Sequence, residues 1–169
     1  MRVLALVVAT LAIACGVASA AEHDASKKVV FVCEHGNVKS LMAASYFNRL
    51  ATQRGLPFRA VSRGVAPDST TVPKAIVAGL RTDGFDVADF HPSKVTATDV
   101  AGAVRTVAIS TDLPASLRID EQSIERWTDV PAASSDYDAA RASLQAHVAA
   151  LLDKLGTTAV LLDGYNRSQ

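Results

Sequence analysis

The sequence predicts a single α/β domain with a parallel sheet covered by helices on both faces, and two observations lead to this fold class. Segments with strand character alternate with segments with helix character along most of the 169 residues, and such alternation is typical of parallel sheets. The strand-like segments are apolar and β-branched without polar alternation, as in strands buried on both faces. We expect the domain to occupy residues 27–156.

Residues 1–20 have the pattern of a secretory signal peptide. One early positive charge precedes an apolar run at 3–14, and small residues follow it. Cleavage after Ala20 would release an exported protein, periplasmic or secreted, with a polar and flexible segment at 21–26. A lipid-modified Cys15 is the alternative, but the residues before it fit a lipoprotein signal poorly.

The first strand and the first helix are predicted on either side of a short loop. The run VVFVC, at 29–33, has the character of a buried strand. The helical pattern begins near Lys39, and Gly55 ends it together with a proline two residues later. A second strand is expected at 58–65.

The middle of the chain repeats this alternation. The second helix is expected between Pro73, near its start, and Gly84, at its exit. A short helix from about Thr98 leads into a third strand at 105–111. The run IERWTDV, at 124–130, can form a fourth strand.

The last helix has the clearest pattern. Ser135 and Asp138 resemble a capping box at its start, and Gly156 is expected to end it. Residues 157–169 form a tail for which no structure is predicted. An apolar stripe at helical spacing would pack on the sheet; it consists of Leu144, Val148, Leu151, Leu152 and Leu155.

Charge and cysteine content limit the partners of the protein. Lys plus Arg and Asp plus Glu both number 17, and the basic residues are scattered, so nucleic acid is not an expected partner. The chain has two cysteines, one of them in the leader, so the mature protein can form no internal disulfide with Cys33. We also expect no metal, no cofactor and no membrane span in the mature chain.

The loop after the first strand raises the question of a nucleophile. Cys33 ends that strand, and ligands of such folds bind beyond the carboxyl ends of the strands. Gly36 and Asn37 tolerate positive φ angles, so the loop can turn its unpaired N–H groups inward at the start of the next helix. Such a nest stabilises a thiolate and also binds an oxyanion. The same residues also fit a small cysteine filling an ordinary turn.

A family resemblance favours the nucleophile. The stretch VVFVCEHGNVKSLMAA resembles the opening of the low-molecular-weight protein tyrosine phosphatases and the related thioredoxin-coupled arsenate reductases, whose signature is a strand, a Cys, five residues, Arg-Ser and a helix. Further similar stretches are VSRGVAPDSTTVPKAI, HPSKV, VAIST and RWTDVPAASSDYDAARASL. The resemblance covers nearly the whole mature chain. It implies a three-layer α/β/α sandwich with a four-stranded parallel sheet, low-molecular-weight phosphatase-like.

The resemblance also implies an activity and a site. Cys33 matches the nucleophile that forms a thiophosphate with a phosphate monoester, tyrosyl phosphate being the implied class. Lys39 matches the position of the signature Arg, and Ser40 matches the Ser that hydrogen-bonds the thiolate. The loop residues expected around the bound oxyanion are Glu34, His35, Gly36, Asn37 and Val38.

Two positions of the predicted site depart from the family pattern. Lys39 keeps the charge of the family's Arg but loses its planar fork, unless it is only a solvated residue of the first helical turn. The family's acid stands directly before a proline, where this chain has Val130. Asp129, one position earlier, is the predicted general acid, with Asp112 as the substitute, whereas Asp136 and Asp138 are expected to cap the last helix.

Two other functions remain open. The arsenate reductases pass oxidation to further cysteines, the first of them near the position of Thr111, so reduction here would need an external thiol. A degenerate module that only binds phosphate or arsenate is the other alternative. Within the loop, Glu34 is expected to point outward, because a carboxylate facing the anion would repel it, and His35 is expected to add a donor or tune the thiolate.

Overall fold

The computed structural model describes residues 27–118 and 120–167. Four strands form one parallel sheet in the order β2-β1-β3-β4. They are β1 (Lys27–Cys33), β2 (Phe58–Gly64), β3 (Arg105–Ile109) and β4 (Ile124–Trp127). The predicted α/β class with a four-stranded parallel sheet is confirmed.

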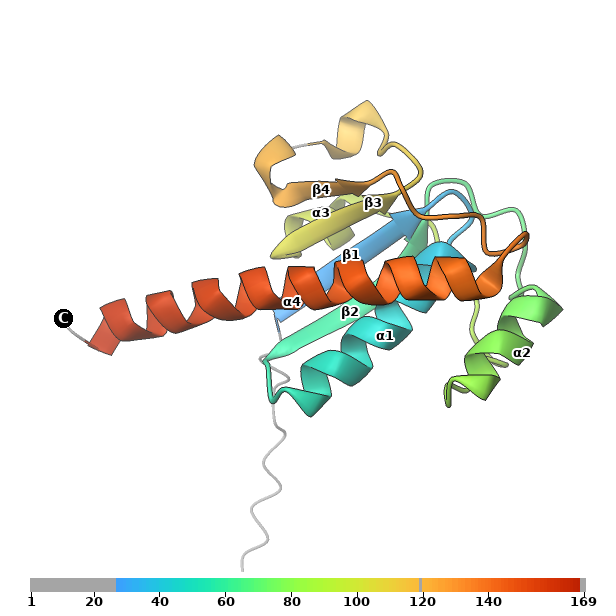
Figure 1. The fold of residues 1–169 in the computed structure, drawn as a ribbon. Helices are drawn as coiled ribbons and strands as arrows, with labels where there is room; N and C mark the ends of the chain where they lie inside the picture. The colour runs from blue at the N-terminus through green and yellow to red at the C-terminus, as the bar shows by residue number, and fades with distance from the viewer. Residues whose placement is uncertain (1–26, 119, 168–169) are drawn as a thin grey trace, which may run out of the picture.

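Helices cover the sheet on both faces (Figure 1). On one face lie α1 (Lys39–Gln53) and the long α4 (Tyr137–Arg167), and α3 (Ala97–Ala101) lies on the other. The helix α2 (Lys74–Thr82) stands near the end of the sheet to which the strand arrows point. Two short 3₁₀ turns precede β4: η1 (Ala115–Leu117) and η2 (Glu121–Ser123).

The central strand β1 explains why its sequence shows no polar alternation. Val29 and Phe31 belong to the apolar cluster that includes α1 and α4, whereas Val30 and Val32 belong to a second cluster with Val100 of α3. Successive side chains of a strand point to opposite faces, so a strand covered on both faces needs apolar residues at every position. All four of these β1 side chains have zero exposure.

Two predicted features of the last helix are wrong. α4 continues through Gly156 to Arg167, so the predicted tail is largely helical. A single glycine costs a helix only about 1 kcal/mol, and no proline follows it in the chain. At the other end, Asp136 rather than Ser135 supplies the cap: its Oδ1 accepts a hydrogen bond from the backbone N–H of Ala139 at 2.9 Å.

The third and fourth strands are shorter than predicted. β3 ends at Ile109 because Ser110 has a φ of 49° and so leaves the extended conformation. β4 ends at Trp127. The residues that follow both strands are therefore loop residues, and several of them take part in the site described below.

The N-terminal predictions lie outside the described residues. They are the signal peptide at 1–20, the alternative lipid anchor at Cys15 and the flexible segment at 21–26, so export stays a prediction. Within the part of the chain that the structure covers, none of the helices combines the length and the apolar character that crossing a membrane requires.

A carboxylate just after α2 joins that helix to α1 and α4. The Asp83 Oδ2 accepts hydrogen bonds from the hydroxyls of Tyr46 at 2.6 Å and Tyr137 at 2.8 Å. Its Oδ1 accepts one from Arg141 at 3.0 Å. Burial acts to raise the pKa of Asp83, but the three donors outweigh it and hold the pKa below its usual value.

Asp83→Asn is expected to lower the free energy of unfolding at pH 7 by about 1.5–3 kcal/mol, the usual contribution of a hydrogen bond to a charged group. Because folding lowers the pKa of Asp83, the stabilisation is present above the unfolded value of about 3.9 and is lost as the pH falls through the folded value. Urea unfolding at pH 7 and at acid pH should therefore show a difference that shrinks in acid. Asp89→Asn, at an exposed position, is the control. A difference that stays constant with pH would contradict the role of the Asp83 charge.

Candidate active site

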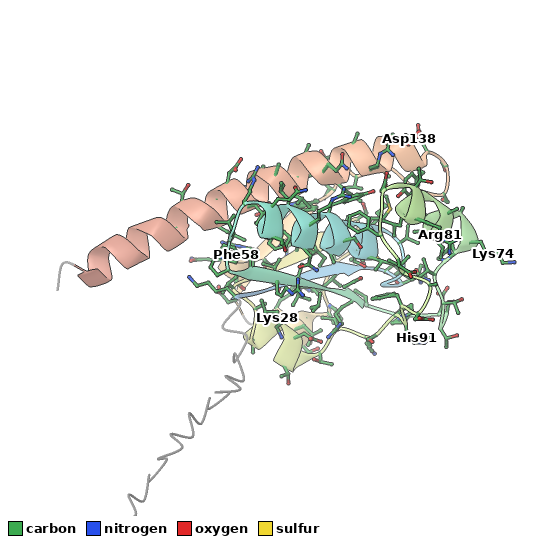
Figure 2. The ribbon with its side chains drawn as sticks, turned by 90° about the horizontal axis from the view of Figure 1, so that it is seen from below. Lys28, Phe58, Lys74, Arg81, His91 and Asp138 are labelled. Carbon is green, nitrogen blue, oxygen red and sulfur yellow. The ribbon has the colours of Figure 1, made fainter. Side chains whose placement is uncertain are left out.

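A pocket of about 300 Å³ opens at the carboxyl end of β1. The same end of the molecule carries Lys74 and Arg81 of α2 and, nearby, His91 (Figure 2). The loop between β1 and α1, the start of α2, the end of β3 and the segment leading into α4 all contribute to the pocket. Its lining residues are Cys33, Glu34, His35, Asn37, Val38, Lys39, Pro73, Ala75, Ile76, Ile109, Ser110, Ala132, Ala133 and Ser134.

The sulfur of Cys33 has two hydrogen-bond partners inside this loop. The backbone N–H of Gly36 donates to Sγ at 3.3 Å, and the Ser40 hydroxyl lies 3.0 Å from it. Ser62 of β2, which the sequence did not indicate, places its hydroxyl 2.8 Å from the Ser40 hydroxyl. These contacts hold Ser40 in place to donate to a negative sulfur.

Two glycines make the tight path of the loop possible. Gly36 has a φ of 78°, the left-handed region that glycine adopts without strain. A Cβ there would lie 2.6 Å from the backbone nitrogen of Gly64, and a Cβ on Gly64 would lie 2.6 Å from the carbonyl carbon of His35. The loop and the end of β2 thus approach so closely that only glycine fits at both positions. Gly64 could have been found within the stretch VSRGV, where it follows the second predicted strand.

Two other loop side chains hold the neighbouring segment in place. Asn37, which is buried, donates from Nδ2 to the carbonyl oxygen of Thr71 at 3.0 Å. His35 places Nδ1 3.3 Å from the carbonyl oxygen of Ala66 and 3.3 Å from a carboxylate oxygen of Asp68. The Nδ1 of His35 therefore fastens the segment after β2, and the expected role as an anion donor is not supported for this atom.

Lys39 bridges two walls of the pocket. Its Nζ donates to the Ser110 hydroxyl at 2.9 Å and to the carbonyl oxygen of Val130 at 2.9 Å. It is the one Lys or Arg among the residues that line the pocket. The ammonium thus lies beside the loop of Cys33 with neutral partners, and its charge is available to a bound anion. The alternative of a merely solvated Lys39 is not supported.

The sequence that forms this site matches a known protein family. Residues 28–150 match the family model of the low molecular weight phosphotyrosine protein phosphatases. The chain belongs to this family. The predicted family resemblance is confirmed over the segment that contains the loop of Cys33, all four strands and the first part of α4.

Solved structures of phosphatases and arsenate reductases share the fold. YfkJ from Bacillus subtilis has a TM-score of 0.70 and 20% identity, covering 79% of this chain and 96% of YfkJ. The low molecular weight protein tyrosine phosphatase from T. tengcongensis has a TM-score of 0.60 and 21% identity, and the match covers 79% of this chain and 99% of that protein. An arsenate reductase from Archaeoglobus fulgidus DSM 4304 has a TM-score of 0.61 and 24% identity, and the match covers 74% of this chain and 98% of the reductase. These identities establish the fold alone, and no curated protein matches the sequence.

This member of the phosphatase family does not place Asp129 in the pocket. The Asp129 carboxylate is 72% exposed, and its Oδ1 lies 2.8 Å from Nε2 of His147 on α4. At the next residue, Val130 is buried and directs its carbonyl oxygen to Lys39. The chain thus presents a carbonyl rather than a carboxylate to the pocket at this point, and the assignment of Asp129 as the general acid is not supported. Asp112 is 87% exposed and also lies outside the pocket lining.

Glu34 departs from the expectation that it faces away from the site. It is exposed, yet it lines the pocket beside Cys33. Its Oε2 accepts a hydrogen bond from the Thr111 hydroxyl at 2.9 Å. Glu34 is thus one of the pocket residues, as the family resemblance implied, and its carboxylate is bonded to Thr111.

A metal site is not part of this pocket. In residues 27–118 and 120–167, the side chains of His, Cys, Asp and Glu form no group of three or more that could hold a metal ion. Besides the Cys33 thiol and the backbone amides of its loop, the pocket is lined by six polar side chains, those of Glu34, His35, Asn37, Lys39, Ser110 and Ser134.

Proposed function

We propose that the protein hydrolyses phosphate monoesters through a thiophosphate on Cys33. One observation carries the proposal: the Cys33 sulfur, with an N–H and a hydroxyl beside it, lines the same pocket as the Lys39 ammonium. The donors stabilise a thiolate, which is the nucleophilic form of cysteine. Membership of the family supports the same chemistry.

The reaction has two steps in this proposal. In the first, the thiolate of Cys33 attacks phosphorus, the S–P bond forms, and the bond from phosphorus to the leaving oxygen breaks. In the second, a water oxygen attacks the phosphoryl group, phosphate leaves, and the thiolate is restored. The loop amides and Lys39 stabilise the charge that shifts onto the equatorial oxygens in both steps.

The walls of the pocket favour an apolar leaving group. Pro73, Ile76, Ile109 and Ala133 line it, and apolar walls with few polar groups suit an aryl ring better than a charged chain. Together with the family this supports an aryl phosphate such as a tyrosyl phosphate as the substrate class.

A binding module without turnover is the second candidate. Two observations favour it: Lys39 replaces the bidentate Arg of the family, and Asp129 is paired with His147 outside the pocket. Such a module would bind phosphate or arsenate through the same amides and ammonium but would not break the ester bond.

Trapping of the covalent intermediate tests the proposal. After mixing with 4-nitrophenyl phosphate and an acid quench, we expect mass spectrometry to find one phosphoryl group on the peptide that contains Cys33, together with release of 4-nitrophenol. Stabilisation of the fold by inorganic phosphate, without any release of nitrophenol or labelling of Cys33, would favour the binding module instead.

A further inference from the structure

The proposed reaction leaves one proton without a donor. When the ester bond breaks, an alkoxide or phenoxide forms unless an acid protonates the leaving oxygen. Neither Asp129 nor Asp112 lines the pocket. His35 lines it, but its Nδ1 is engaged with the segment after β2. The pocket must therefore supply the proton from another group or accept only leaving groups that need none.

Glu34 is the one carboxyl side chain among the residues that line the pocket. It follows Cys33 directly in the chain, at the point where β1 ends, so the nucleophile and the carboxyl group belong to adjacent residues of one loop. Thr111 holds its Oε2 at 2.9 Å, which leaves the other carboxyl oxygen free of the contacts described for this group.

The partner of Glu34 is itself next to the anion site. Thr111 follows Ser110, whose hydroxyl accepts from the Lys39 ammonium at 2.9 Å. The carboxyl group is thus held on the β3 side of the pocket, beside the wall to which Lys39 is bonded. Glu34 and Ser110 thus both line the space in which a leaving group can bind.

We propose that Glu34 is the general acid and base of this enzyme, in the place of the displaced Asp129, and that Thr111 positions it. The inference rests on the proposed phosphatase function. In the first step the protonated carboxyl group gives its proton to the leaving oxygen as the P–O bond breaks. In the second step the resulting carboxylate takes a proton from the attacking water as the S–P bond breaks, which restores the acid.

The charge of the substrate is compatible with this role. A negative carboxylate would repel a phosphate dianion, but a neighbouring dianion in turn favours the neutral, protonated form of a carboxyl group. The Thr111 hydroxyl can donate to the carboxyl group in either protonation state, since one oxygen always keeps a lone pair for it.

A series of aryl phosphates tests the proposal in the full protein. General acid catalysis typically contributes about 10²–10⁴-fold, and a leaving group of low basicity needs little of it. Glu34→Gln keeps the size of the side chain and an oxygen for Thr111 but has no proton to give. We expect kcat/KM, which reports the step that breaks the P–O bond, to fall by roughly a hundredfold or more on phenyl phosphate but by only about tenfold or less on 2,4-dinitrophenyl phosphate.

The same series contains the outcomes that overturn the proposal. An equal loss of kcat/KM on both esters would mean that Glu34 acts on binding or structure and not as an acid. If Asp129→Asn, and not Glu34→Gln, increases the dependence on the leaving group, the acid is Asp129. Thr111→Val should give the pattern of Glu34→Gln with a smaller loss, and an unchanged rate would remove Thr111 from the positioning role.

Failure of the parent proposal looks different. If Cys33 is never phosphorylated and no ester in the series is hydrolysed by the unaltered protein, the phosphatase function itself is wrong. A labelled Cys33 and an unaltered leaving-group dependence in Glu34→Gln would overturn only the role of Glu34.

Discussion

Cys33→Ser is expected to reduce kcat for 4-nitrophenyl phosphate by roughly a thousandfold or more, the scale on which loss of a catalytic nucleophile is usually felt. The N–H of Gly36 and the hydroxyl of Ser40 lie at 3.3 and 3.0 Å from the sulfur and stabilise its negative form. A serine hydroxyl ionises far less readily than a thiol, so the same two donors do not make it a comparable nucleophile. Steady-state release of nitrophenol measures the loss.

A binding measurement separates chemistry from folding in this variant. Serine is close to cysteine in size, and the amides of the loop and the Lys39 ammonium are unchanged by the substitution. Thermal unfolding with and without inorganic phosphate should therefore show a similar stabilisation in both proteins. Rates of the two proteins that agree within a few-fold would exclude Cys33 as the nucleophile.

Lys39→Met should lower kcat by about 10²–10³-fold, as removal of one preorganised oxyanion donor does in other enzymes. The substitution removes the one cationic side chain that lines the pocket. It also removes the hydrogen bonds to Ser110 and Val130 that join two walls. Initial rates on an aryl phosphate, together with the affinity for inorganic phosphate, would distinguish loss in the transition state from loss of binding.

Two further variants make the effect of Lys39 specific. Lys39→Arg is expected to raise turnover by about tenfold, because a bidentate fork adds a charged hydrogen bond worth about 1.5 kcal/mol or more. Lys74→Met is the matched control: Lys74 belongs to α2, next to pocket residues, but its side chain points away from the molecule (Figure 2). Equal losses in Lys39→Met and Lys74→Met would indicate a general effect of net charge and not a contact with the anion.

Much of the fold and part of the site could be predicted from local patterns. The apolar run at 29–33 predicted a strand and the stripe that begins at Leu144 predicted a helix, because buried positions recur at a different spacing in each. Both elements are present. The loop with Cys33 and Gly36 could be predicted because the end of the strand, the glycine with positive φ and the start of the helix are close together in the chain. Such features are local, so neighbouring residues contain the information.

The positions of the carboxylates around the pocket could not be predicted in this way. Asp129 and Glu34 are both carboxylates near the expected site in the sequence, yet the first is paired with His147 and the second lines the pocket. The partner of Glu34 is Thr111, which is 77 positions away. The position of a carboxylate depends on the hydrogen-bond partner that packing brings close to it. A partner so far away in the chain cannot be predicted from the neighbouring residues.

The sequence by itself determined the order of strands and helices along the chain and the turn that surrounds Cys33. The spacing of buried positions and the conformational freedom of the backbone are properties of short segments. Only the tertiary structure decided which polar groups meet. In the folded chain Gly36 lies against Gly64, and Lys39 donates hydrogen bonds to Ser110 and Val130. The helix α4 also continues through Gly156. Such contacts between distant segments exist only once the sheet and its helices have packed, and they decide which side chains line the pocket.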